Sequence, residues 1–183
     1  CGWMEFYNRQ EDVDFDRLCA AIEDAKMIEV CSTTLPQKAL PHILGSSKYE
    51  EYRKTENEKI GIRSKIITEI LSDVPYIYFN ETFGAFYNTI VFKEGVLKKG
   101  AGIKIKDPKR QELLKSWLTD DMELDQVFVY NLLAATGVCV VPLSSFHSEL
   151  KGFRVTLLEN NESLLKHIFS EIRKSLMEFC ADD

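Results

Sequence analysis

The residue whose type and position point most directly to chemistry is Arg154. It lies in the run FRVTLL at 153–158, whose alternation and β-branched side chains predict a strand. A buried guanidinium is costly unless an acceptor meets it, and it binds a carboxylate through two parallel hydrogen bonds. Alternation places Phe153 and Val155 on one face of the strand and Arg154 on the other. Two interpretations stay open: a surface arginine on a wet face, or an arginine in a cleft that binds a carboxylate.

Other groups that could do chemistry give weaker signals. His42, His147 and His167 have no ligand spacing to one another or to a cysteine, so no metal site is predicted. Cys139 and His147 could form a nucleophile pair on paper. Cys139 falls in an apolar run, however, where a structural thiol is expected. Arg154 therefore remains the candidate for a functional residue.

The composition is that of an ordinary globular chain. Its 183 residues are 45% hydrophobic and 28% charged, and the net charge of −6 argues against nucleic acid or an anionic membrane as a partner. The five cysteines are an odd number without a C-x-x-C pair, which favours reduced thiols and a cytoplasmic location. No apolar run reaches the length of a membrane span. The opening CGWMEFYN is strand-like and has no initiator methionine, so the chain looks cut from a longer protein.

Periodicity and capping signals predict an order of elements. Strands are expected at 1–8, 76–80, 85–92, 138–141 and 153–158, and helices at 14–28, 35–44, 47–72, 107–118, 121–136 and 162–179. Ser47 and Glu50 form a possible capping box for the long helix, and Gly137 is expected to close a helix. From residue 47 onward this order predicts an α+β fold, with a small sheet and helices packed on one face.

Several stretches resemble class I/II aminotransferases, the fold type I pyridoxal-phosphate enzymes. GVCVVPLSSF at 137–146, followed by GFRVTLL at 152–158, is similar to the family's "G-[VI]-x-[VF]-x-P-G-x-x-F" and "[FY]-R-[ILV]-[ST]" segments. CGW at 1–3, STTLPQ at 32–37 and ETFGAFYNTIVF at 81–92 also come in the family's order. Leu143 and His147 depart from the pattern, because they stand at or near positions where the family has glycine.

The resemblance implies the C-terminal part of such an enzyme. Residues 1–45 would be the last strand and helices of the large cofactor-binding α/β domain. Residues 46–183 would be the small C-terminal domain, including the long bridging helix. The parent would be a transaminase that moves an amino group between an amino acid and a 2-oxo acid, with pyridoxal 5′-phosphate as the cofactor of the full-length enzyme and a homodimer as its assembly.

The resemblance also assigns roles to residues. Arg154 would bind the α-carboxylate of the substrate from the small domain. The family's Schiff-base lysine and phosphate-binding arginine fall before Cys1, so this chain by itself is expected to hold no catalytic residue and no cofactor, and to be inactive. No residue of the chain is assigned to cofactor binding.

Two other functions stay open from the sequence. One is a non-catalytic α+β module for ligand sensing or dimerisation, in which Arg154 is a surface residue. The other is a pyridoxal-phosphate lyase or acyl-transferase on the same fold, because the type of reaction depends on the whole site. Residues upstream of Cys1 would distinguish these functions.

Overall fold

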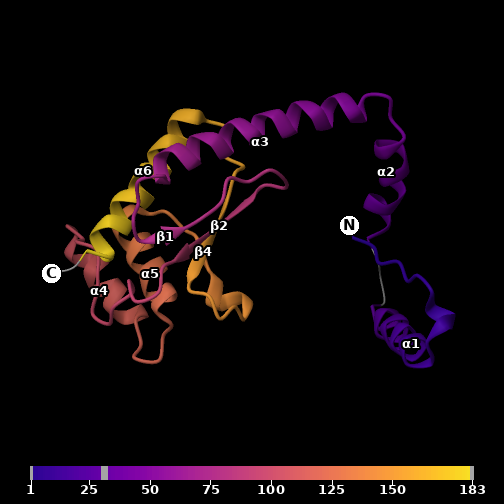
Figure 1. The fold of residues 1–183 in the computed structure, drawn as a ribbon, viewed down its shortest axis with the longest axis horizontal. Coiled ribbons are helices and arrows are strands. Elements are labelled where there is room, and N and C mark those ends of the chain that lie inside the picture. The colour runs from indigo at the N-terminus through magenta and orange to yellow at the C-terminus, as the bar shows by residue number, and fades with distance from the viewer. Residues whose placement is uncertain (1, 30–32, 182–183) are drawn as a thin grey trace. The chain divides into compact units, whose positions relative to one another are not determined.

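The computed structural model describes residues 2–29 and 33–181. The chain divides into two compact units, Cys1–Arg53 and Lys54–Asp183, each with its own internal packing (Figure 1). No helix within the described ranges combines the length and the hydrophobicity needed to cross a bilayer. The domain boundary expected at residues 45–46 refers to a larger enzyme and stays a prediction.

The first unit is built from short helices. Its elements are the 3-10 turn η1 (Arg9–Glu11) and the helices α1 (Val13–Met27) and α2 (Thr34–Leu44). Asp12 caps α1, because its carboxylate accepts hydrogen bonds from the backbone N–H groups of Asp14 and Phe15 at 2.8 and 2.9 Å. The strand predicted at 1–8 is wrong over the described residues, which leave out Cys1. A strand needs a neighbouring strand for its backbone groups, and the described part of this unit contains none.

Helix α3 (Tyr49–Leu71) is polar and exposed at its start and becomes apolar towards its end. Its buried residues are Ser64, Ile67 and Leu71. The capping box predicted between Ser47 and Glu50 does not form. The helix begins two residues after Ser47, and the Glu50 carboxylate pairs with Arg53 at 2.7 Å instead. Because the buried residues of α3 all lie in its second half, only the later turns of this helix contribute to a core.

The second unit contains an antiparallel sheet of four strands. They are β1 (Ile77–Tyr78), β2 (Tyr87–Phe92), β3 (Val141–Pro142) and β4 (Gly152–Thr156), in the order β1-β2-β4-β3. Figure 1 labels β1, β2 and β4. The strands predicted at 76–80 and 85–92 form an antiparallel pair, with Ile77 opposite Phe92. The strand predicted at 138–141 pairs only at its last residue, because the residues before Val141 line a cavity and join no ladder.

Three helices complete the second unit. They are α4 (Pro108–Trp117), α5 (Leu124–Thr136) and α6 (Glu162–Phe179), and a 3-10 turn, η2 (Leu143–Phe146), follows β3. Asp107 caps α4 and accepts a hydrogen bond from the N–H of Lys109 at 2.9 Å, so the helix begins within one residue of the predicted range. Helix α5 begins three residues later than predicted from Asp121. Gly137 ends it in the left-handed region, at φ 80°, as predicted.

The core lies between one face of the sheet and the helices. Four phenylalanine rings meet there, with neighbouring centroids 5.1 to 5.9 Å apart: Phe92, Phe128, Phe153 and Phe179. The last helix contributes an apolar stripe that includes Leu165, Phe169 and Ile172, whereas Leu164 is 43% exposed. The chain is thus an α+β structure with a small antiparallel sheet and six α-helices in its described residues.

Gly152 allows β2 and β4 to approach each other closely. A Cβ atom at this position would lie 2.2 Å from the carbonyl oxygen of Ile90 and 3.0 Å from the Cα of Val91. Backbone atoms of a neighbouring strand cannot move aside as a flexible side chain can, so any larger residue forces the two strands apart.

We expect Gly152→Ala to lower the free energy of unfolding by about 1–3 kcal/mol, the range typical of overpacking. The matched control is Gly61→Ala in α3, where a Cβ meets nothing within 4 Å. Because alanine is the better helix former, this control should raise stability by up to about 1 kcal/mol. Urea denaturation of both variants checks the pair. Equal stability of Gly152→Ala and the parent chain would contradict the close approach.

Candidate functional site

Arg154 lies in the middle of β4, on the face of the sheet away from the core. The burial pattern of β4 follows the predicted alternation, with Phe153 and Val155 buried and Arg154 half-buried. Arg154 is opposite Thr89 of β2 and opposite Val141 of β3. The strand that carries the arginine is therefore paired on both sides, and its backbone is fixed.

Two aromatic rings flank the Arg154 guanidinium. Its Cζ atom lies 4.3 Å from the ring centroid of Tyr87 and 4.3 Å from that of Phe146. Each such contact is worth about 0.5–2 kcal/mol, depending on how far it is shielded from water. Packing against the two rings restricts the position of the guanidinium.

The hydrogen-bonding edge of this guanidinium is free within the described residues. No carboxylate, carbonyl or hydroxyl oxygen among them accepts a hydrogen bond from the Arg154 side chain, and no ion pair involves it. Other arginines of the same unit are paired: Arg173 binds both oxygens of Asp73, and Arg63 donates to the carbonyl of Leu157 at 2.9 Å. Arg154 is thus an oriented cation that can bind an anion.

Residues from several elements position this site. Tyr87 begins β2 on the same face as Arg154, because it is opposite Thr156, two residues further along β4. Phe146 ends the η2 turn, and His147 follows it in the left-handed region at φ 56°. Tyr87 and Phe146 both lie in stretches that resemble the aminotransferase family, but neither was predicted to contact Arg154. The contact of Tyr87 depends on the register of β2, and that of Phe146 depends on the conformation of the turn.

A buried carboxylate joins the elements around the site. Asp125 is 0% exposed and accepts from the backbone N–H groups of Ser144 at 3.0 Å and Gly152 at 3.3 Å. The position of Asp125 is not predictable from the sequence, because an acidic residue in a first helical turn usually serves the helix alone.

Lys151, close to Asp125, forms an ion pair with Glu123 at 2.7 Å. The pKa of Lys151 is raised above its ordinary value, mainly by the hydrogen bond with Glu123 and also by the charge of Asp125.

A cavity of about 350 Å³ runs along β4 and the segment before β3. The residues that line it are apolar or small apart from Arg154: Gly137, Val138, Cys139, Val140, Val141, Arg154, Val155, Thr156, Ile168, Phe169 and Ile172.

The expectation that Cys139 is a structural thiol is wrong, since its side chain is exposed. No hydrogen bond between Cys139 and His147 occurs in the described chain. Within the described residues, no group of histidines, cysteines and carboxylates is arranged to hold a metal ion.

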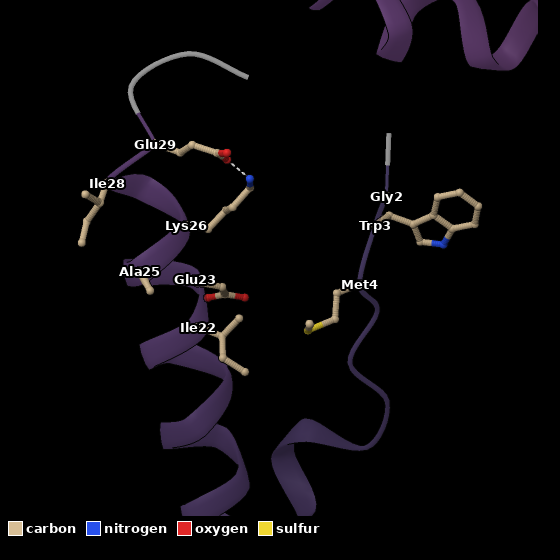
Figure 2. Close-up of a pocket in the computed structure, with 9 residues that line it drawn as sticks. All are labelled: Gly2, Trp3, Met4, Ile22, Glu23, Ala25, Lys26, Ile28 and Glu29. Carbon is tan, nitrogen blue, oxygen red and sulfur yellow. Dashed lines mark ion pairs between the residues drawn. The ribbon is translucent and has the colours of Figure 1, made fainter. Parts of the chain in front are cut away.

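A wider groove of about 900 Å³ lies in the first unit, between the N-terminal segment and α1 (Figure 2). Met4 extends towards α1, where Ile22 and Ala25 lie, whereas Trp3 extends away from the helix (Figure 2). The charged groups at this groove are already paired, Lys26 with Glu29 and Glu23 with Arg9. The groove is therefore an apolar surface and offers little for catalysis.

The chain is similar to part of an aminotransferase. It is 42% identical over 179 residues to an uncharacterized aminotransferase of Methanocaldococcus jannaschii. The matched stretch is 98% of this chain and 41% of that protein, so the chain spans about two fifths of the length of the relative. No protein-family model matches the chain.

We expect the described cysteines to differ in reactivity. Cys139 is exposed, whereas Cys19 and Cys180 are buried, and burial raises the pKa of Cys180 to about 11. Because the thiolate is the reactive form, Cys180 should stay unmodified by iodoacetamide at pH 8 and gain reactivity only as the pH rises towards that pKa. Peptide mapping by mass spectrometry should find Cys139 alkylated first. Faster labelling of Cys180 than of Cys139 would contradict the packing of the last helix.

Proposed function

We propose that this chain is the carboxylate-binding part of a pyridoxal-phosphate-dependent transaminase, and that Arg154 binds the substrate's α-carboxylate. The observation that carries the proposal is the state of Arg154: its guanidinium is flanked by Tyr87 and Phe146, and no oxygen of the described residues pairs with it. A fixed, unpaired guanidinium suits two parallel hydrogen bonds with a carboxylate. The similarity to an aminotransferase supports the same function.

In this proposal Arg154 contributes positioning. Amino acids and 2-oxo acids both carry the carboxylate, so one arginine serves both halves of an amino-group transfer. Holding the carboxylate at two points fixes the direction of the Cα atom relative to the rest of the site, which is how oriented binding lowers a barrier. The rings of Tyr87 and Phe146 reduce the freedom that the guanidinium loses on binding.

The described residues do not fit the cofactor by themselves. Pyridoxal phosphate needs a lysine for its Schiff base, and no lysine lines the cavity beside Arg154. The cofactor would supply the electron sink for the transfer. We propose that residues of the larger enzyme hold it, and that the 183-residue chain alone is inactive. We therefore assign this chain no catalytic residue.

The remaining parts of the proposal concern the larger enzyme. Residues 1–45 would end its large domain and residues 46–183 would form its small domain, in a fold type I homodimer located in the cytoplasm. The apolar surface of the first unit supports an attachment to further protein, because Trp3, Met27 and Ile28 are 74–80% exposed. The four-stranded sheet with its helices is compatible with a small domain.

Arg154→Lys in the full-length enzyme tests the carboxylate role. The substitution keeps the charge and loses the two-pronged geometry, so we expect kcat/KM for amino acids and 2-oxo acids to fall by about 30-fold to several thousand-fold, which corresponds to roughly 2–5 kcal/mol. Turnover of a primary amine without a carboxylate should be almost unchanged, and so should the melting temperature.

Arg173→Lys is the matched control for this experiment. It makes the same chemical change at an arginine that pairs with Asp73 on the surface, outside the carboxylate site. We expect no change in the ratio of amino-acid to amine turnover. Equal losses of amine and amino-acid activity in Arg154→Lys, or failure of this variant to fold, would show that Arg154 is structural.

A second prediction concerns the 183-residue chain alone. Mixed with pyridoxal phosphate and reduced with borohydride, it should show no stoichiometric adduct at one lysine, because no lysine lines the cavity beside Arg154. Scattered modification of surface lysines is the expected background. A single fully modified lysine found by peptide mass spectrometry would overturn the claim that the cofactor is held elsewhere.

A further inference from the structure

Asp125 is buried where three elements meet. It lies in the first turn of α5 and is 0% exposed. Its Oδ2 atom accepts from the N–H groups of Ser144 and Gly152, and its Oδ1 atom accepts from the N–H of Gln126 at 3.0 Å. A fully buried carboxylate is costly unless its oxygens are satisfied, and three backbone N–H groups, one each from α5, η2 and β4, satisfy this one.

The two amides bound by Oδ2 belong to the two segments that build the arginine site. Ser144 lies in η2, the turn that carries Phe146, and Gly152 begins β4, the strand that carries Arg154. One oxygen atom thus holds the start of the turn and the start of the strand at a fixed separation. Residues 145–151 between them make few contacts with the core, since most of them are exposed.

Tyr87, one of the two rings beside Arg154, is positioned independently of Asp125. Tyr87 is placed by the pairing of β2 with β4, which brings it opposite Thr156. Phe146 joins no ladder, so its position over Arg154 depends on how η2 is anchored. The start of η2 is held by the pairing of Pro142 with Phe153 and by the buried Leu143. The hydrogen bond from Ser144 to Asp125 anchors the turn one residue closer to Phe146.

We infer that Asp125 is a positioning residue for the carboxylate site, acting through Phe146 and Arg154. The inference rests on the proposed function of Arg154. Loss of the Asp125 carboxylate removes the tie at Ser144, which leaves η2 held to β4 only through Pro142 and Leu143, so Phe146 is less firmly placed against the Arg154 guanidinium. The consequence is weaker binding of carboxylate substrates, with the chemistry at the substrate's other groups unaffected.

Asp125→Asn in the full-length enzyme is the primary test. Asparagine has the same shape, but its NH2 group must face a backbone N–H group, either that of Gln126 or those of Ser144 and Gly152, so the charge and at least one hydrogen bond are lost in either orientation. We expect kcat/KM for amino acids and 2-oxo acids to fall by about 10- to 100-fold, the scale expected for a small misplacement in a site. The fall should appear mainly in KM, and turnover of an amine without a carboxylate should be retained.

Asn131→Ala is the control for loss of a buried polar contact on the same helix. Asn131 is 3% exposed, accepts from the N–H of Ile103 at 3.1 Å and donates to the carbonyl of Val127. It touches neither η2 nor β4 in these hydrogen bonds. We expect this variant to lower the melting temperature while leaving the ratio of amino-acid to amine turnover unchanged. If the ratio of amino-acid to amine turnover changes equally in Asp125→Asn and Asn131→Ala, the role of Asp125 is only structural.

A double-mutant cycle separates this inference from the proposed function. If Asp125 acts through Arg154, Asp125→Asn should add little to the loss already caused by Arg154→Lys, whereas independent effects would multiply and overturn the inference. If the loss of activity in Arg154→Lys is not selective for carboxylate substrates, the proposed function itself fails.

Phe146→Leu is the second variant, used if Asp125→Asn does not fold, because Phe146 is 45% exposed and its loss spares the core. A carboxylate-selective loss in Phe146→Leu supports the inference, and unchanged kinetics overturn it.

Discussion

The antiparallel contact between β2 and β4 runs from Tyr87 opposite Thr156 to Val91 opposite Gly152. At Gly152 the two backbones come so close that a single methyl group cannot be placed between them. This contact fixes the register, and the register decides which side chains share a face. A shift by one residue would turn Arg154 into the phenylalanine core and bring Phe153 out of it.

The two faces of the sheet have different physical roles. The inner face packs into the aromatic core, and hydrogen bonds at the edge of this core attach α3 to the segment after β4. Arg63 of α3 donates to the carbonyl of Leu157 and, at 2.6 Å, to the side chain of Asn160, just after β4. The outer face has no covering helix in the described unit and carries Arg154. The two-residue period of the strands thus separates the core-facing side chains from Arg154, the proposed carboxylate ligand.

Much of the second unit could be predicted from the sequence, because local signals and tertiary packing agree there. The last helix has the predicted bounds, since its apolar stripe and its core face coincide. The α4 start at Asp107 and the helix end at Gly137 follow from capping chemistry. Prediction failed where a neighbouring strand was required. Residues 1–8 have the pattern of a strand, but residues 2–8 form no ladder because the described part of this unit offers no strand to pair with.

The candidate site could be predicted only in part. The alternation of 153–158 put Arg154 on the correct face, and a family resemblance suggested its ligand. The rings over its guanidinium could not be predicted, because they depend on the register of Tyr87 and on the turn at Phe146. The role of Asp125 was hidden for a similar reason: its partners Ser144 and Gly152 are backbone amides, which leave no signature in a sequence.

The rings beside Arg154 also determine where water can reach its charge. With Tyr87 and Phe146 each 4.3 Å from its Cζ atom, the guanidinium has part of its surface against aromatic rings instead of water. This part of its dehydration is completed when the protein folds, before any ligand arrives. A flat anion can place both of its oxygens in the plane of the guanidinium, where the N–H groups point. Less water therefore remains to be displaced from this arginine than from one on an open surface.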